Sequence, residues 1–190
     1  MRPEQAKARE YLHRKGTLLA PSVIRERVSA AFEATEAFLG GVSEGEARRR
    51  PAPTEWCVQE VVDHLVETHR PSLDELRCLL RGERPAAGPI PASLQSRAPL
   101  ERPWPELLAE LGRLHAEILE LLVRIPDDFT SSARAPVVLV INAKNADGSE
   151  SPLHWVEELD WKAYAVIFRL HEIDHVNQAR RALSALQKEA

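Results

Sequence analysis

The sequence is poor in cysteine: only Cys57 and Cys78 occur among its 190 residues. Both fall within one expected helix, where a rise of about 1.5 Å per residue separates them by roughly 30 Å. A disulfide needs Cα atoms within about 7 Å of each other, so these two cannot pair within the chain. A secreted framework held together by disulfides is therefore excluded.

Long apolar runs are also missing. The longest, Val137 to Ile141, is far shorter than the roughly 18 residues needed to span a bilayer. The N-terminus carries charges and has no apolar stretch like that of a signal peptide. We therefore predict a cytoplasmic protein without a membrane partner.

The sequence also lacks a concentrated cluster of positive charge. The net charge is −4, and the basic residues are dispersed apart from Arg48, Arg49 and Arg50. Because phosphate binding requires a basic face, we expect no nucleic-acid partner. The sequence also lacks a glycine-rich phosphate loop, a dinucleotide fingerprint and a Ser-His-Asp arrangement, so these motifs assign no function.

What is present is typical of a globular protein, with 44% apolar and 28% charged residues. The length suits one domain, and we predict a single domain over residues 1–190 with its core at about 20–187. Such a chain can bury a core without disulfides or a structural metal. A bound metal is therefore expected to serve function rather than to hold the fold together.

Apolar residues at helical spacing predict four long helices. Their expected bounds are 23–39, 56–82, 105–124 and 152–186, and a polar leading helix is expected over 3–15. Pro71 falls inside the second pattern, so we expect a kink or a break there. Four long amphipathic helices indicate a mainly α protein built as a four-helix bundle.

One segment interrupts the helical pattern. Residues 126–152 contain the β-branched run Val137 to Ile141 and the turn signal Asp147-Gly148. We predict a short strand or hairpin here, which is a β excursion before the last helix. The segment 137–148 is expected to shape either a pocket or an interface, and the sequence leaves both open.

Among the seven histidines, His171 and His175 are the most informative. At positions i and i+4 of a helix they lie about 40° apart on one face, so both imidazoles can reach one metal ion. On a helical wheel they fall within the apolar arc, whereas Glu172 falls mostly on the solvated side. Two ligands hold a metal poorly, so a third is required. The alternative is a pair of core histidines that are hydrogen-bonded to backbone or carboxylate groups.

His64 is the first candidate for the third ligand, because it lies at the edge of the apolar stripe of the second helix. Glu60 and Glu67 lie about one turn away on either side, and either can accept a hydrogen bond from the outer ring N–H. Asp174 is a further carboxylate near the histidine pair. His69 is the rival ligand on the second helix.

The string from His171 to His175 also fits the zinc-protease motif H-E-x-x-H, with Glu172 as general base. The extended form of that motif needs a third histidine where this chain has Arg181, and no histidine follows His175. The predicted fold also lacks the sheet that supports such a helix. The triad with His64 is therefore preferred, while the direction of the remaining candidate, His115 on the third helix, stays open.

With these motifs in order, the sequence resembles the DinB-like, or YfiT-like, four-helix-bundle family. The resemblance rests on Trp56 at the start of the second helix, His64 eight residues later, and the pair His171 and His175 in the last helix. It covers about residues 20–187. It implies one divalent metal ion, typically nickel or zinc, bound by the three histidines with positions open to water. Homodimers are common in the family.

The resemblance leaves the chemistry open. Some relatives are transferases or isomerases that use a low-molecular-weight thiol, and the same metal site can activate water for hydrolysis. We expect a metal-dependent S-transferase or hydrolase acting on a small-molecule substrate, with its catalytic residues unknown. The alternative is a non-catalytic, stress-associated bundle that binds a metal or a ligand. Cys57 stands where the family often has a capping serine or threonine; a thiol there can be nucleophilic, but a structural capping position is the simpler interpretation.

Overall fold

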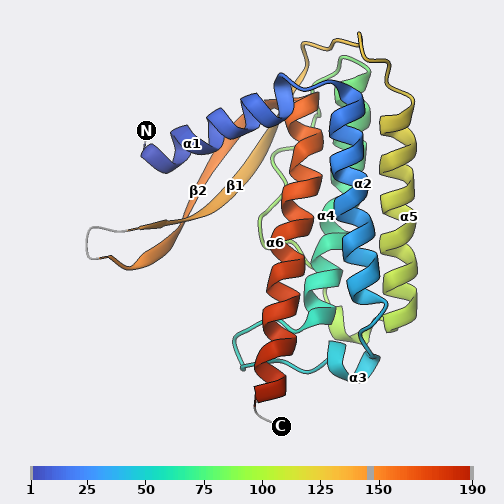
Figure 1. Ribbon diagram of the computed structural model, residues 1–190, viewed down its shortest axis with the longest axis vertical. Coiled ribbons are helices and arrows are strands. Elements are labelled where there is room, and N and C mark those ends of the chain that lie inside the picture. The colour runs from blue at the N-terminus through green and yellow to red at the C-terminus, as the bar shows by residue number, and fades with distance from the viewer. Residues whose placement is uncertain (1, 145–147, 189–190) are drawn as a thin grey trace.

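The computed structural model describes residues 2–144 and 148–188 and shows helices with one long hairpin (Figure 1). The helices are α1 (Pro3–Leu12), α2 (Pro21–Leu39), α3 (Glu44–Ala47), α4 (Val58–Leu80), α5 (Trp104–Val123) and α6 (Trp161–Lys188). A π-helical turn, His13–Thr17, follows α1, and a 3-10 turn, Pro99–Glu101, precedes α5. None of the described helices is both long and apolar enough to cross a membrane.

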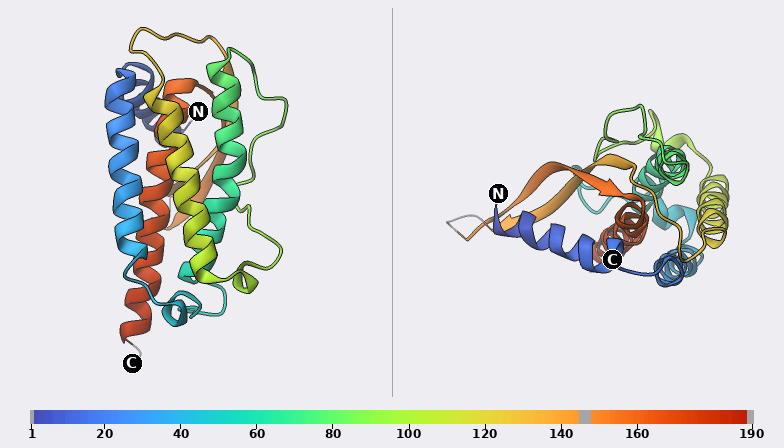
Figure 2. Two further views of the ribbon diagram at one scale, coloured as in Figure 1. Left: turned by 90° about the vertical axis from the view of Figure 1, so that its right-hand side faces the viewer. Right: turned by 90° about the horizontal axis from the view of Figure 1, so that it is seen from above.

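Helices α2, α4, α5 and α6 form a four-helix bundle (Figure 2). The main contacts run around it from α2 to α6, α4, α5 and back to α2. Buried side chains from all four helices form one apolar core, which includes Ile24, Phe32, Leu65, Leu76, Leu111, Ile118 and Phe168. The predicted fold, a mainly α four-helix bundle with a β excursion before the last helix, is confirmed.

Helices α2, α4 and α5 begin and end within two residues of the predicted positions. Of the kink or break predicted at Pro71, the break does not occur, since α4 is continuous with this proline inside it. A proline within a helix costs about 3 kcal/mol, because one hydrogen bond is lost and the ring crowds the preceding turn. The leucines that follow, Leu73, Leu76 and Leu79, are fully buried, and their burial offsets this cost.

The β excursion is longer than predicted. Strand β1 (Arg134–Lys144) pairs antiparallel with β2 (Glu150–Asp160). Strand β2 takes the residues expected to begin the last helix, so the predicted start of that helix at 152 is wrong. Pairing with the β-branched strand β1 stabilises an extended conformation that local periodicity does not reveal. In the predicted turn, Gly148 has a φ of 82°, which favours glycine, and Asp147 lies outside the described residues.

Helix α6 begins where the hairpin ends. Asp160 Oδ1 accepts hydrogen bonds from the backbone N–H groups of Lys162 and Ala163, each at 3.0 Å, as a capping aspartate does. The π-helical turn packs closely on the same end of α6, where a Cβ on Gly16 would lie 2.7 Å from Ala163 Cα. These contacts place α1 and the hairpin on one side of the bundle, next to α6 (Figure 1).

Candidate metal centre

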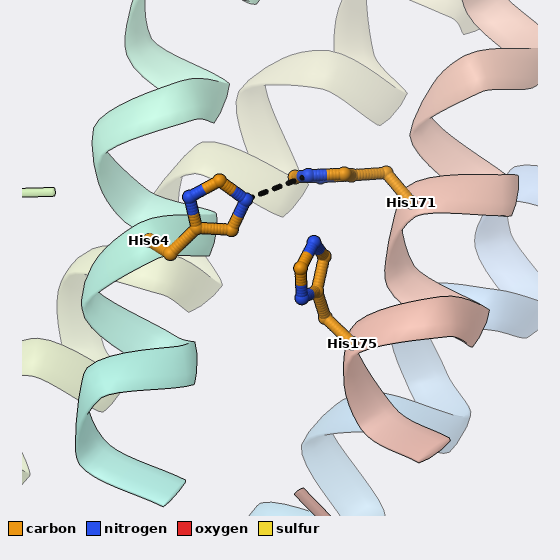
Figure 3. Close-up of side chains that lie close together, drawn as sticks. All are labelled: His64, His171 and His175. Carbon is orange, nitrogen blue, oxygen red and sulfur yellow. Dashed lines mark hydrogen bonds between the residues drawn. The ribbon is translucent and has the colours of Figure 1, made fainter. Parts of the chain in front are cut away.

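Three histidines converge between α4 and α6 (Figure 3). His64 projects from α4, and His171 and His175 project from successive turns of α6. One ring nitrogen from each lies within 4.8 Å of the other two, and His64 Nε2 lies 3.0 Å from His171 Nε2. This group, the pocket triad, brings together the three residues that the sequence singles out as ligands, although 107 residues separate His64 from His171.

Hydrogen bonds to the outer nitrogens set the tautomers of two rings. His64 Nδ1 donates to the carbonyl oxygen of Leu94 at 2.7 Å, and His175 Nδ1 donates to Gln178 Oε1 at 2.9 Å. In a neutral imidazole the second nitrogen then carries a free lone pair. In both rings this is Nε2, which faces the centre of the triad (Figure 3).

The donor set fits a divalent metal ion. Zinc–nitrogen bonds of about 2.0–2.1 Å in tetrahedral geometry place ligand nitrogens roughly 3.3 Å apart. The 3.0 Å between the Nε2 atoms of His64 and His171 is close to that spacing. Three neutral nitrogens suit zinc, nickel and similar first-row ions better than magnesium or calcium, which prefer oxygen ligands.

The surroundings keep these imidazoles neutral. Burial lowers the pKa of His64 and, more strongly, the pKa of His171. Burial, together with the neighbouring His64 ring, lowers the pKa of His175 to about 4. A protonated imidazole cannot bind a metal, so the lowered pKa values leave all three ligands available at neutral pH.

An aromatic ring and a clamped loop hold His64 in place. The ring of Trp56 lies 5.3 Å from that of His64, between centroids. Leu94, which accepts the hydrogen bond from His64, belongs to the connection between α4 and α5. Ser96 ties this connection to α4, because its N–H and its hydroxyl each donate to the buried Asp63 carboxylate at 2.8 Å. Sequence reasoning missed Asp63, since its partner lies 33 residues away in a segment without periodicity.

The carboxylates expected near the triad have other partners. Glu60 forms an ion pair with Arg50, and Glu67 forms one with Arg70 at 2.6 Å. Asp174 is exposed and lines the pocket described below. Nδ1 of His64 therefore donates to the backbone carbonyl of Leu94, although a glutamate was the expected acceptor.

The pocket triad lies in the wall of a cavity of about 1160 Å³. Helices α1, α4 and α6, both strands and the connection after α4 all contribute to it. Its lining is mainly apolar and includes Tyr11, Val138, Val140, Ile167 and Phe168. Polar residues also line it, among them Tyr164 and Glu75: the Tyr164 hydroxyl donates to Glu75 Oε2 at 2.6 Å, and burial raises the pKa of Glu75. The segment 137–148 was expected to shape either a pocket or an interface, and its residues 137–142 line this pocket.

A second cluster of metal-binding residue types lies in the bundle core. His69, His115 and Glu172, the core triad, also have ligand atoms within 4.8 Å of one another. Glu172 is fully buried at 0% exposure, so its predicted place on the solvated side of the helix is wrong. The physical reason is that α6 packs against both α2 and α4 and therefore buries a wider arc than its apolar residues mark. His69, the rival ligand, lies 3.0 Å from Glu172.

Comparisons with known proteins agree with this architecture. The sequence model of the DinB superfamily matches residues 27–179. No curated protein matches the chain. Among solved structures, the fold is similar to YfiT from Bacillus subtilis, described as a probable metal-dependent hydrolase with an unusual four-helix bundle topology. The TM-score is 0.63 at 17% sequence identity, over 93% of this chain and 98% of that chain. The match over residues 27–179 shows that this chain belongs to the DinB superfamily.

Proposed function

We propose that this protein is a hydrolase of a small molecule that depends on one divalent metal ion, nickel or zinc, bound by the pocket triad. The observation that carries the proposal is the convergence of three neutral imidazoles in the wall of a cavity large enough for a small molecule. Catalytic metal sites typically have three protein ligands and an open position, whereas structural sites are closed. The description of YfiT as a probable metal-dependent hydrolase supports the same reaction class.

An ion at this site supplies Lewis acidity, since it polarises a substrate oxygen and lowers the pKa of water. The chain's own residues bind and orient the substrate. The apolar wall around Val138 and Phe168 excludes bulk water and so strengthens electrostatic interactions inside the pocket. Glu75, with its raised pKa, offers a hydrogen-bonding group at the same wall. Asp174 is our candidate for the carboxylate that accepts a proton, because it lines the pocket beside the ligand helix.

The test uses protein freed of metal by chelation and then reloaded with Ni²⁺ or Zn²⁺. Metal content is measured by mass spectrometry, and hydrolysis is measured on a panel of small esters and amides. We expect activity only in the reloaded protein. The variant His171→Ala should lose one metal equivalent and the activity, with affinity at this site reduced at least about 100-fold, since even outer-sphere contacts are worth 10–100-fold. His13→Ala removes an exposed histidine outside the pocket and is the matched control.

Four outcomes would change the assignment. Unchanged metal content in His171→Ala would contradict the ligand set. Hydrolysis that survives chelation would contradict the metal dependence. A product that carries the added thiol, in a parallel assay with low-molecular-weight thiols, would identify an S-transferase. Metal binding without turnover in any assay would favour the non-catalytic, stress-associated bundle.

The remaining expectations from the family resemblance stay predictions. A homodimer is checked by light scattering on the purified protein, and a cytoplasmic location by fractionation of the source cells. A thiol cosubstrate is checked by the parallel assay above.

A further inference from the structure

We propose that the core triad is a second, buried site for a divalent ion of the zinc type, separate from the pocket triad. His69 comes from α4, His115 from α5 and Glu172 from α6. An ion bound there would cross-link three of the four bundle helices. Its role would be to hold the helices that carry the pocket triad, rather than to contact a substrate.

The spacing of the ligand atoms suits such an ion. His69 Nε2 lies 3.0 Å from Glu172 Oε1, and His115 Nε2 lies 3.2 Å from the same oxygen. Tetrahedral zinc with ligand bonds of about 2.0–2.2 Å requires separations of roughly 3.3 Å. Two imidazoles and one carboxylate are also a common ligand set for zinc in proteins.

An unsatisfied nitrogen gives a second, independent indication. Within residues 2–144 and 148–188, His69 Nε2 is a buried side-chain atom without a hydrogen-bond partner. The Glu172 oxygen at 3.0 Å does not have the alignment that a hydrogen bond needs. Ligand atoms around an ion point at a common centre and not at one another. A cation at that centre would satisfy the nitrogen, which protein groups leave without a partner.

The outer contacts are those that a metal site requires. His115 Nδ1 contacts Glu36 Oε1 at 2.8 Å, and Nε2 of the same ring donates to Glu172 Oε1 at 3.2 Å; an ion at the centre would take the place of the Nε2 proton. A carboxylate on the outer nitrogen is the usual partner of a metal-bound histidine. Thr35 Oγ1 donates to Glu172 Oε2 at 2.5 Å and so orients the carboxylate with Oε1 towards the two imidazoles. Both outer partners lie on α2, so the site involves all four bundle helices.

Aromatic rings pack on both imidazoles of the site, and His69 also lines the cavity beside the pocket triad. The ring of Phe32 stacks on His115 with centroids 3.9 Å apart, and Phe168 lies edge-on to His69 at 5.3 Å. The three ligand residues are at most 1% exposed. The carboxylates of Glu172 and Glu36 together balance the charge of a divalent ion. The charge of a buried dication at this position would thus be compensated by protein carboxylates.

The experiment measures Zn²⁺ stoichiometry in three forms of the whole chain after chelation, titration and gel filtration. We expect about two equivalents in the wild type and about one in the variant His171→Ala/His175→Ala, which retains only the core triad. The variant His69→Gln should bind about one equivalent, at the pocket triad. Glutamine keeps an N–H that can donate to Glu172, and circular dichroism verifies the fold. His13→Gln is the matched control and should bind as the wild type does.

Two further measurements locate the ion. Zn²⁺ should raise the Tm of His171→Ala/His175→Ala by several degrees, because it binds the folded state only, and this rise should vanish when His69→Gln is added. Crystals of the Zn²⁺-loaded wild type should show two anomalous-scattering peaks, one at each triad.

The proposal is overturned if folded wild type binds one equivalent and His171→Ala/His175→Ala binds none. The core triad would then be a hydrogen-bonded network without an ion. Failure of the pocket triad gives a different pattern: one equivalent that persists in His171→Ala/His175→Ala and is lost in His69→Gln.

Discussion

The pocket triad and the core triad use the same two helices but meet different surroundings. His64 and His69 both lie on α4, and His171 and Glu172 are adjacent on α6. The pocket triad consists of nitrogens only and lines a cavity, whereas the core triad includes a buried carboxylate and packs against aromatic rings. A step of five residues along α4 and one along α6 thus separates three histidines in the cavity wall from a cluster in which His69 lines the cavity and His115 and Glu172 do not.

The largest effect is expected from removing the carboxylate of the core triad. Glu172→Ala leaves two buried histidines and a threonine without their shared partner, and breaking a buried pair in this way typically costs 3–5 kcal/mol. Urea denaturation measures this loss in the free energy of unfolding. Asp174→Ala, two positions on and exposed, should change it by less than about 0.5 kcal/mol. If both variants had equal, small effects, the core triad would not contribute to the stability of the bundle.

The two triads should also differ in the pH window over which they stabilise the metal-free protein. Burial raises the pKa of Glu172, but the neighbouring His115 and His69 lower it more, so the net shift is strongly downward. Its stabilisation is therefore present above the unfolded pKa of about 4.3 and is lost as the pH falls below that value. The pKa of His175 is lowered to about 4, so the unfolded chain binds the extra proton between about pH 6.5 and 4. As the pH decreases over that range, the free energy of unfolding decreases by up to about 3 kcal/mol.

Unfolding free energies measured from pH 7 to pH 3 separate these windows. His175→Ala should flatten the curve between about pH 6.5 and 4, and Glu172→Gln should flatten it below about 4.3. A wild-type curve that is flat from pH 7 to 4 would contradict the lowered pKa of the pocket histidine.

A smaller effect is expected at the loop clamp of the pocket triad. Asp63→Asn weakens the tie to Ser96 and the ion pair with Arg102, so the Leu94 carbonyl is held less firmly against His64. Contacts of this kind are worth 10–100-fold in metal affinity. Competition with a coloured chelator should show that loss in Asp63→Asn and none in Asp74→Asn, whose carboxylate is exposed on the same helix. Equal affinities would mean that the loop does not orient the ligand.

The smallest effect concerns the start of α4, one end of the helix that both triads share. Burial raises the pKa of Cys57 to about 11, so only about 0.1% is thiolate at pH 8. Iodoacetamide should therefore modify the partly exposed Cys78 and leave Cys57 unmodified, as peptide mass spectrometry would show. Rapid labelling of Cys57 would support a nucleophilic thiol at this position. It would also indicate that the start of α4 becomes exposed to solvent.

Local sequence patterns determined most of the bundle. The periodicity of apolar residues predicted α2, α4 and α5 to within two residues, because each of these helices buries one stripe and shows it in sequence. The same argument failed at 152–160. There a nine-residue stretch expected to be helical is the strand β2, since its conformation depends on pairing with β1.

The sequence by itself also singled out the three residues of the pocket triad: His171 and His175 by their i, i+4 spacing, and His64 by the family resemblance that begins at Trp56. Only the tertiary structure decided what surrounds them. It showed that Leu94 accepts from His64, that Asp63 clamps the loop, and that Glu172 faces inward. These contacts join segments that are 30 to more than 100 residues apart in the sequence. The local spacing of apolar residues does not specify which helix packs against a given side chain across the core.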